Sequence, residues 1–380
     1  MNARRLLASL LLLPGLALAA NIPDPPTIAA KSWVLMDAAS GEVLAGNNAE
    51  ARVEPASITK VMLSYVVYDE IARGRASLED MVLISEKAWR QGIDSSESRM
   101  FLNVGSRVKL EDLLRGIVIQ SGNDSSIAMA EHLAGSEQAF AELMNQHAKR
   151  LGMKNTHFTN APGLPDAEHY TTAHDLALLG QALIRDFPDH YPMYAEKEFV
   201  YNGIRQANRN YLLGKDPSVD GIKTGHTQAA GYCLLASAQR EGRRLISVVM
   251  GADSWAYREQ ATQELLSWGF RFFETVKLFG AETPAGKTVV WKGARPEVAV
   301  GTLEPLALTL PRETKDRLEV QTRFDGPAIA PLSRGQTVGQ LTVSLDGKTL
   351  RELPLVVLED VPAGSWWRRL IDTLRLWLFG

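Results

Sequence analysis

The sequence predicts an α/β domain in which helices cover a mostly antiparallel sheet, followed by a small all-β domain and a C-terminal amphipathic helix. Two changes along the chain carry this prediction. Strand-like segments stand on both sides of a helical region between about residues 70 and 215, and strands that enclose a helical insertion favour an α/β domain. After about residue 280 the helical pattern gives way to short alternating strands separated by turns, which is typical of a small sandwich.

Composition and charge indicate an ordinary globular protein. The 380 residues suffice for two domains, 45% of them are hydrophobic and 22% are charged. The formal net charge is −3 and no basic tract dominates, so no nucleic-acid partner is expected. Cys233 is the single cysteine, which excludes an internal disulfide, and it is interpreted as a small buried apolar residue of a strand.

Residues 1–20 are typical of a secretory signal peptide. Two arginines precede an apolar run over 6–18, which ends in the small-residue sequence Ala17-Leu18-Ala19. We expect cleavage directly after this sequence or one residue later. The run is too short to span a bilayer, so the mature chain is expected to be exported.

The first elements of the mature chain are a hairpin and a buried helix. Segments 32–37 and 42–45 flank the turn sequence 38–41 and predict two paired strands. The stretch 61–71 is apolar on nearly every face, and a helix of that kind is a buried one. Pro55 suits the first turn of this helix, because a missing N–H costs nothing there.

The remaining elements follow from the period of the apolar residues. Helices are predicted over 110–119, 127–133, 173–184 and 260–276. Strands of the α/β domain are predicted over 221–225, 231–239 and 245–251, and those of the β domain over 288–291, 298–300, 306–310, 318–321, 338–343 and 353–358. The predicted organisation is a signal peptide over 1–20, an α/β domain over 28–278, an all-β domain over 279–361 and an amphipathic helix over 363–380.

The first turn of the predicted buried helix carries a hydroxyl and an amine. Ser57 and Lys60 lie three positions apart and therefore on one face of a helix. A lysine amine loses affinity for its proton when it is desolvated or placed near another cation, and it can then act as a base toward a neighbouring hydroxyl. The plainer interpretation is that Ser57 caps the helix and Lys60 reaches solvent, since Ser-x-x-Lys alone is a common pattern.

Two further short motifs follow in the chain. Ser121-Gly122-Asn123 comes after a predicted helix, and Lys223-Thr224-Gly225 lies on the first strand of the late group. Each alone would suggest only a turn or an edge strand. Together with Ser57-x-x-Lys60, in this order, they form the trio of penicillin-binding proteins and class A β-lactamases. The chain thus resembles the low-molecular-mass penicillin-binding D-alanyl-D-alanine carboxypeptidases.

This resemblance extends over essentially the whole mature chain, including its tail, and it implies a β-lactamase/transpeptidase-like fold for the first domain. Four further segments carry it: 170–176, 219–222, 226–227 and 268–274. One position departs from the trio, because the middle residue of the second motif is Gly122 where aspartate is usual. That position supplies neither the hydroxyl nor the amide, so no loss of function is expected.

The resemblance implies serine acyl transfer on peptidoglycan stem peptides. Ser57 would be the nucleophile, acylated by the carbonyl between two D-alanines, and Lys60 would accept its proton as a neutral amine. Burial and the nearby cation Lys223 would both favour that neutral form. Ser121 would relay the proton to the leaving amine, and β-lactam antibiotics would acylate the same nucleophile.

Substrate-binding residues are implied in the same way. Asn123 would hydrogen-bond the peptide backbone of the substrate, and the strand Lys223-Thr224-Gly225 would offer an edge to which an extended peptide adds. Gly225 would leave room for the close approach of that backbone.

Backbone N–H groups and an arginine would bind the negatively charged oxygens of the substrate, namely the oxyanion formed during the reaction and the terminal carboxylate. The N–H groups of Ser57 and His226 would form the oxyanion hole. Arg258 would bind the terminal carboxylate through its planar donor fork, the alternative being an ordinary solvated arginine at a helix start. No cofactor is implied, and no metal site either: the seven histidines are scattered, and His169 and His174 lack the H-E-x-x-H pattern.

Other functions share part of this pattern. A DD-endopeptidase that cuts crosslinks would use the same acyl chemistry. A class A-like β-lactamase shares the trio, but no Glu-x-x-Leu-Asn occurs between Ser121 and Lys223 to drive deacylation, and a lactamase has no use for the β domain and tail. An inactive wall-binding scaffold would not need the intact trio. For the β domain itself, a passive spacer and a protein- or glycan-binding role both stay open.

The tail over 363–380 predicts a peripheral membrane anchor. It is too short and too charged to span a bilayer, whereas tryptophan with arginine favours the interfacial plane. The expected location is the periplasmic face of the bacterial inner membrane. A helix docked on the β domain is the alternative, although Pro362 and the two residues after it suggest a hinge. At helical spacing one side carries Trp366, Trp367, Leu370, Ile371, Leu374, Trp377 and Leu378, whereas Leu376 and Phe379 depart from the pattern.

Overall fold

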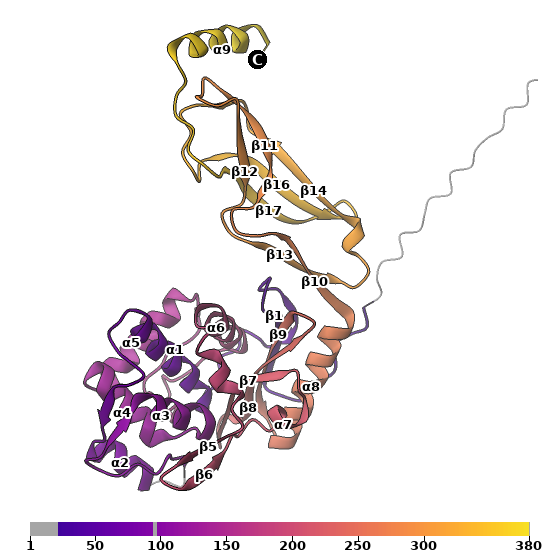
Figure 1. Cartoon of the computed structure of the whole chain (residues 1–380). Helices are drawn as coiled ribbons and strands as arrows, with labels where there is room; N and C mark the ends of the chain where they lie inside the picture. Colours follow the sequence, from indigo (N-terminus) through magenta and orange to yellow (C-terminus); the bar gives the residue numbers. More distant parts are fainter. Residues whose placement is uncertain (1–21, 94–96, 380) are drawn as a thin grey trace, which may run out of the picture.

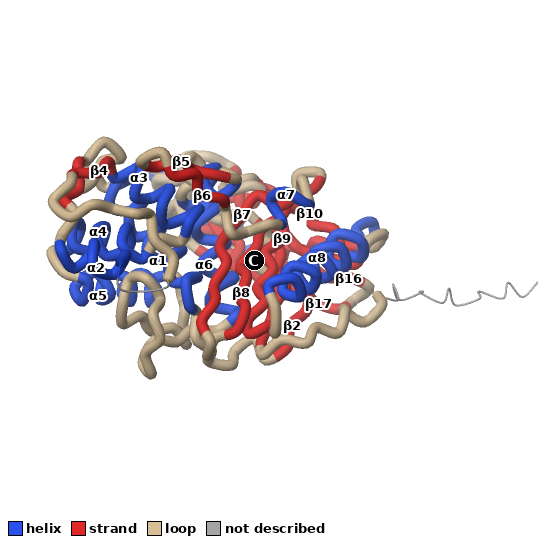
Figure 2. Tube along the Cα trace, turned by 90° about the horizontal axis from the view of Figure 1, so that it is seen from below, coloured by secondary structure: helices blue, strands red, loops and turns tan. Residues whose placement is uncertain are grey.

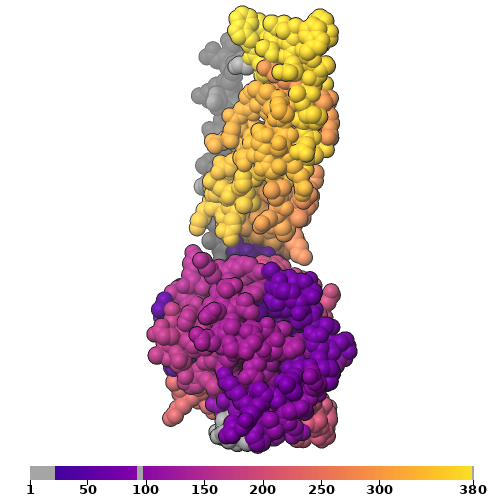
Figure 3. Space-filling view, turned by 90° about the vertical axis from the view of Figure 1, so that its left-hand side faces the viewer, coloured from indigo at the N-terminus to yellow at the C-terminus, as the bar shows by residue number. Residues whose placement is uncertain are grey.

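The structure, a computed structural model, describes residues 22–93 and 97–379. The predicted signal peptide lies outside these residues. The molecule is elongated, with a broad α/β domain, a narrower β domain above it and a C-terminal helix at the far end of the β domain (Figure 1, Figure 3). The fold class predicted from the sequence is confirmed.

The α/β domain is built on a five-stranded sheet in which every neighbouring pair is antiparallel. β1 lies at its second position and pairs with β9 from the other end of the domain, Trp33 standing opposite Val249. The order is β2 (Val43–Asn47), β1 (Ser32–Asp37), β9 (Arg243–Ala252), β8 (Gly231–Arg240) and β7 (Val219–Thr227). β7 therefore forms one edge of the sheet.

Both faces of this sheet are covered. Val34 and Met36 of β1 join the apolar cluster of the helical layer, whereas Trp33 and Leu35 join the cluster beneath α8 (Trp255–Phe272). Successive side chains of a strand point to opposite faces, so the sheet separates the helical layer from α8, as Figure 2 shows.

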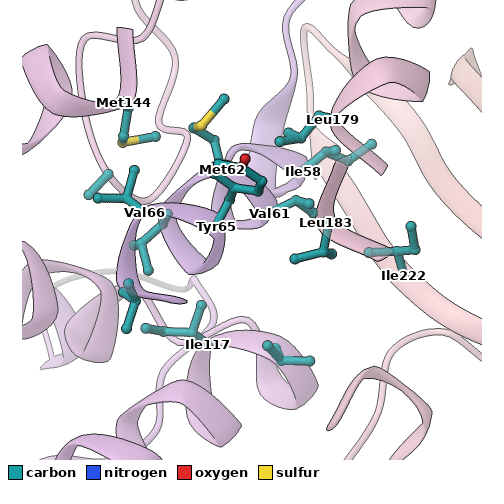
Figure 4. Packing of buried hydrophobic residues seen from close by; sticks show 14 of the residues in the cluster. Ile58, Val61, Met62, Tyr65, Val66, Ile117, Met144, Leu179, Leu183 and Ile222 are labelled. Atoms are coloured by element: carbon teal, nitrogen blue, oxygen red, sulfur yellow. The ribbon is translucent and has the colours of Figure 1, made fainter. Parts of the chain in front are cut away.

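The helical layer surrounds α1 (Thr59–Ala72). Eleven consecutive residues from Thr59 to Asp69 are buried, which confirms the predicted helix with apolar residues on all sides. Figure 4 shows its side chains between those of neighbouring helices, with Val66 near Ile117. The other helices are α2 (Glu86–Ile93), α3 (Leu110–Arg115), α4 (Asn123–Ala134), α5 (Glu137–Arg150), α6 (Ala173–Asp186) and the short α7 (Leu212–Lys215). Two small two-stranded sheets complete the domain: β3 (Met81–Leu83) with β4 (Arg107–Lys109), and β5 (Glu198–Tyr201) with β6 (Ile204–Ala207).

Two predicted helices end differently from expectation. The helix over 110–119 begins as α3 but finishes in a π-helical turn, Gly116–Gln120. The helix over 260–276 is α8, which ends at Phe272, so the prediction was wrong for its last four residues. They belong to β10 (Phe273–Phe279), where β-branched Thr275 and Val276 pair with a distant strand. Tertiary pairing overrides local apolar spacing there.

The β domain consists of two sheets around one apolar cluster. β10 pairs with β13 (Leu306–Pro311), and Leu308 and Leu310 enter the cluster from this side. Leu341 and Val343 enter it from the larger sheet, which makes the arrangement a sandwich. That sheet has the order β14 (Leu318–Phe324), β16 (Thr337–Leu345), β17 (Lys348–Val357), β12 (Glu297–Gly301), β11 (Pro284–Trp291) and β15 (Ala328–Ile329).

The C-terminal helix α9 (Trp366–Phe379) is held by its polar side. Asp372 is only 8% exposed and accepts a hydrogen bond of 2.7 Å from the Lys292 N–H. The preceding link is also bound, because Pro362 O accepts from the Ala294 N–H at 2.9 Å. The link expected to act as a hinge is thus hydrogen-bonded to the β domain in this structure. Seven large apolar residues of α9 remain exposed: Trp366, Trp367, Leu370, Ile371, Leu374, Trp377 and Leu378.

Candidate active site

Ser57 lies in a single tight turn, Ala56–Ile58, that leads directly into α1. Ala56 has a φ of 48°, a conformation that side chains rarely adopt. Gly163 packs against its carbonyl, and a Cβ on Gly163 would lie 2.0 Å from Ala56 O, so only glycine permits this approach. The serine is therefore presented from a closely packed turn.

Lys60 lies beneath the nucleophile and is 1% exposed. Its Nζ is 3.1 Å from Ser57 Oγ. The amine also donates to Asn123 Oδ1 and to Pro162 O, each at 2.7 Å. The structure thus brings together the hydroxyl and amine that the sequence predicted on one helix face.

Burial is the main influence on the Lys60 amine and lowers its pKa to about 7. Among charged groups, Glu97 and Asp124 raise this pKa, whereas Arg209 lowers it. Arg209 thus takes the part expected of Lys223, which was predicted to be the cation that lowers the Lys60 pKa. Burial first, and then the charge of Lys60, hold the pKa of Lys223 itself well below its ordinary value.

Asn123, the first residue of α4, contacts Lys60, and Ser121 lies two residues before it in the chain. Ser121 has a φ of 68° at the end of the π-helical turn, and its buried Oγ has no hydrogen-bond partner within the described residues. Gly122 lies between them, and a Cβ there would come 2.9 Å from Asp124 Oδ1 and 2.5 Å from Ser125 Oγ. The glycine of this motif thus fits a crowded backbone.

Strand β7 passes beside the nucleophile turn. Lys223 and Thr224 are 2% and 6% exposed. Gly225 was expected to make room for a substrate backbone, but a Cβ on it would lie 3.0 Å from Pro55 O and 3.2 Å from Ile58 Cγ1. The glycine therefore lets the strand pack against the turn that carries the nucleophile.

His226 and Arg258 complete the predicted set. The His226 ring packs against Tyr232 with 4.1 Å between centroids. Arg258, in the first turn of α8, is 5% exposed, so it is not a solvated arginine. Its Nη1 makes only long contacts, 3.5 Å to Gly225 O and 3.4 Å to Cys233 O, and its Nε has no partner among the described residues.

These side chains surround one open cleft of about 1370 Å³. Two of the predicted residues, Lys60 and Lys223, are buried and do not line it. Within residues 22–93 and 97–379, no group of three His, Cys, Asp or Glu side chains is placed to hold a metal ion. The predicted residues that line the cleft are Ser57, Ser121, Asn123, Thr224, Gly225, His226 and Arg258.

Three charged residues of the site were missed by sequence reasoning. Glu97 lines the cleft and accepts a hydrogen bond from Asn123 Nδ2. Asp124 is buried and accepts hydrogen bonds from the Met100 N–H, at 2.8 Å, and from the Leu102 N–H. These two bonds hold the segment after α2 against the cleft. Arg209 lines the cleft from the loop before α7. None belongs to a motif of the trio, and the folded chain brings them to the cleft.

Comparisons with known proteins identify the family of this chain. Residues 19–254 match the family described as D-alanyl-D-alanine carboxypeptidase, and residues 273–363 match the family described as penicillin-binding protein 5, C-terminal domain. The chain belongs to the D-alanyl-D-alanine carboxypeptidase family. The predicted resemblance to low-molecular-mass penicillin-binding proteins is confirmed.

Individual members of the family align over most of the chain. D-alanyl-D-alanine carboxypeptidase DacA of Escherichia coli is 45% identical over 359 residues, which cover 93% of this chain and 89% of that protein. The crystal structure of penicillin-binding protein 5 from Haemophilus influenzae is 41% identical, with a TM-score of 0.86 over 90% of this chain and 99% of that one. Penicillin-binding protein D2 of Listeria monocytogenes in its cefotaxime-bound form is 28% identical, with a TM-score of 0.60 over 65% of this chain and 100% of that one.

Proposed function

We propose that the chain removes the terminal D-alanine from peptidoglycan stem peptides through an acyl-enzyme on Ser57. Hydrogen bonding of Lys60 is the observation that supports this most. A neutral primary amine has two N–H donors and one lone pair. The two 2.7 Å contacts to Asn123 Oδ1 and Pro162 O use both donors, so the lone pair remains for the Ser57 hydroxyl.

The protonation state of Lys60 suits this task. A pKa of about 7 leaves a large neutral fraction at neutral pH, and a base is most useful when its pKa lies near the working pH. Lys60 takes the Ser57 proton as Oγ attacks the carbonyl carbon between the two D-alanines. Hydrogen bonds from the Ser57 and His226 N–H groups stabilise the resulting oxyanion.

Collapse of this intermediate breaks the peptide bond and leaves an ester on Ser57. The departing D-alanine amine needs a proton, and the partnerless Ser121 Oγ supports a relay of that proton from Lys60. Water then attacks the ester carbonyl and gives a proton to Lys60. Lys60 returns this proton to Ser57 Oγ as the ester C–O bond breaks and the shortened peptide leaves with a free carboxylate. A β-lactam presents a strained amide to the same Oγ, which supports acylation by these antibiotics.

Substrate recognition is assigned to polar groups with donors to spare. Arg258 has an unpartnered Nε and only long contacts at Nη1, so it can turn its fork toward a terminal carboxylate, with Thr224 beside it. The Asn123 amide keeps one N–H for the substrate backbone, because it has two and Glu97 takes one. The backbone of β7, the edge strand of the sheet, offers the edge along which the peptide lies.

The products from intact peptidoglycan test this function. A carboxypeptidase shortens pentapeptide stems by one residue and leaves crosslinked dimers in place, which mass spectrometry of the digested glycan measures. Appearance of monomers at the expense of crosslinked dimers would instead support the DD-endopeptidase alternative. Persistence of all pentapeptides, with only a β-lactam hydrolysed, would support the β-lactamase alternative.

We also propose that α9 holds the mature protein on the periplasmic face of the inner membrane. The described chain has no helix with the length and apolar content needed to cross a bilayer. α9 instead exposes a row of apolar residues, in which Trp377 is 81% exposed, and binds the β domain through buried Asp372. An amphipathic helix with exposed tryptophans suits the membrane interface. Docking on the β domain and anchoring therefore use opposite sides of the helix.

A further inference from the structure

Glu97 brings a carboxylate into the hydrogen-bond chain of the active site. Its Oε2 accepts from Asn123 Nδ2, and Gln91 Nε2 approaches the same oxygen at 3.5 Å. Asn123 Oδ1 in turn accepts from Lys60, which lies against Ser57. Four side chains are thus connected in the order Glu97, Asn123, Lys60 and Ser57.

This chain of contacts determines which way the Asn123 amide faces. A side-chain amide has a donor end and an acceptor end, and either end can face a neutral lysine, which both donates and accepts. An ionised carboxylate only accepts. Glu97 therefore holds the NH₂ end of Asn123 toward itself and leaves the oxygen toward Lys60.

The orientation of the amide has a consequence for the base. With the oxygen toward a neutral Lys60, Asn123 takes one amine N–H and Pro162 O takes the other. The lone pair is then left for the Ser57 hydroxyl, whose Oγ is 3.1 Å from Nζ. With the amide reversed, its NH₂ end would occupy the lone pair of a neutral Lys60. The base would then be blocked in the very state in which it must act.

We propose that Glu97 is a positioning residue for acylation, which acts through Asn123 to direct the lone pair of Lys60 at the Ser57 hydroxyl. The inference rests on the proposed roles of Ser57 and Lys60. It assigns Glu97 no proton transfer and no contact with the reacting carbonyl. Glu97 is exposed at the cleft, so its replacement removes no part of the apolar core.

The charge of Glu97 adds a second, separable effect. Lys60 is faced by Glu97, by Asp124 of α4 and by Arg209, and it is coupled to Lys223 of β7 and to buried His169. Glu97 raises the Lys60 pKa and so opposes burial, the dominant cause of its lowering to about 7. Loss of the charge should lower the Lys60 pKa. The fall in acylation rate on the acidic side of the pH–rate profile, the acid limb, should then occur at lower pH.

Penicillin acylation measured from pH 5 to 9 tests the proposal without the need for a peptide substrate. Glu97→Gln should move the acid limb down by about half a pH unit, because one exposed charge acting through a polar medium has an effect of that order. Its plateau rate should fall about three- to tenfold, since a glutamine can turn either end toward Asn123 and no longer enforces the amide orientation. Glu97→Asp keeps a carboxylate, which is charged and only accepts hydrogen bonds. It should therefore restore part of the plateau rate and reduce the shift of the acid limb.

Glu86→Gln is the matched control. The same exchange is made on α2, where the exposed Glu86 pairs with Arg90 outside the cleft. Its profile should superimpose on that of the wild type. If the plateau rate of Glu97→Gln equals that of the wild type, the positioning role is wrong, whether or not the acid limb moves. If the wild type itself forms no adduct on Ser57, the proposed function fails instead.

Discussion

The pH dependence of acylation follows directly from the environment of Lys60. In the proposed mechanism acylation requires a neutral Lys60 amine, and burial lowers the Lys60 pKa to about 7 from an ordinary value of 10.5. Because only the deprotonated form reacts, about half of the enzyme is competent at pH 7, about one tenth at pH 6 and about one hundredth at pH 5. The second-order rate constant of acylation should therefore fall about tenfold per pH unit below pH 6 and level off above pH 8.

A fluorescent penicillin and rapid mixing measure this rate constant at each pH. Circular dichroism across the same range controls for unfolding, so that a fall in rate is not mistaken for a loss of structure. A rate that keeps rising to pH 10 would mean that Lys60 retains its ordinary pKa. A rate that is level down to pH 5 would mean that another group accepts the proton. Either result would refute the assignment of Lys60 as the base.

Four further changes have defined outcomes. Arg209→Gln removes the cation that lowers the Lys60 pKa and should move the acid limb of acylation to higher pH, opposite to Glu97→Gln. Arg258→Ala should lower kcat/KM for a D-alanyl-D-alanine peptide about ten- to hundredfold. Amidation of the peptide carboxylate should lower the kcat/KM of this variant little further. If amidation lowers kcat/KM equally in the variant and the wild type, Arg258 does not bind the carboxylate. Deletion of 363–380 should release an active enzyme from membranes, and a truncated form that stays membrane-bound, or that loses activity on a soluble peptide, would contradict the anchor. Asp372→Ala should keep membrane binding but increase protease cleavage near residue 363, and unchanged cleavage would mean that the bond to the Lys292 N–H does not hold α9.

Much of the site could be predicted because its chemistry lies in short motifs. Ser57 lies in the turn that leads into α1 and Lys60 in the first turn of α1, so the two lie close together whatever the rest of the fold. The other two motifs of the trio mark the elements that complete the site. The buried nature of α1 also followed from its local composition alone. These are properties of contiguous segments, which a single sequence displays directly.

The parts that could not be predicted depend on contacts between distant segments. Glu97 and Arg209 reach Lys60 only after the chain folds, and no motif marks either of them. Gly225 was predicted to make room for the substrate, whereas it packs against Pro55 O. The two residues are separated by more than half of the catalytic domain's sequence, so the sequence does not reveal this contact. The link at Pro362 looked flexible for the same reason, since its partner Ala294 lies in another loop.

The site of the covalent adduct tests the central claim most directly. The protein is incubated with penicillin, digested and mapped by mass spectrometry, in parallel with Ser57→Ala. One penicilloyl group on the peptide that contains Ser57, and none in the variant, is the predicted result. An adduct on Ser121, or an unchanged adduct in Ser57→Ala, would contradict the assignment of Ser57 as the nucleophile.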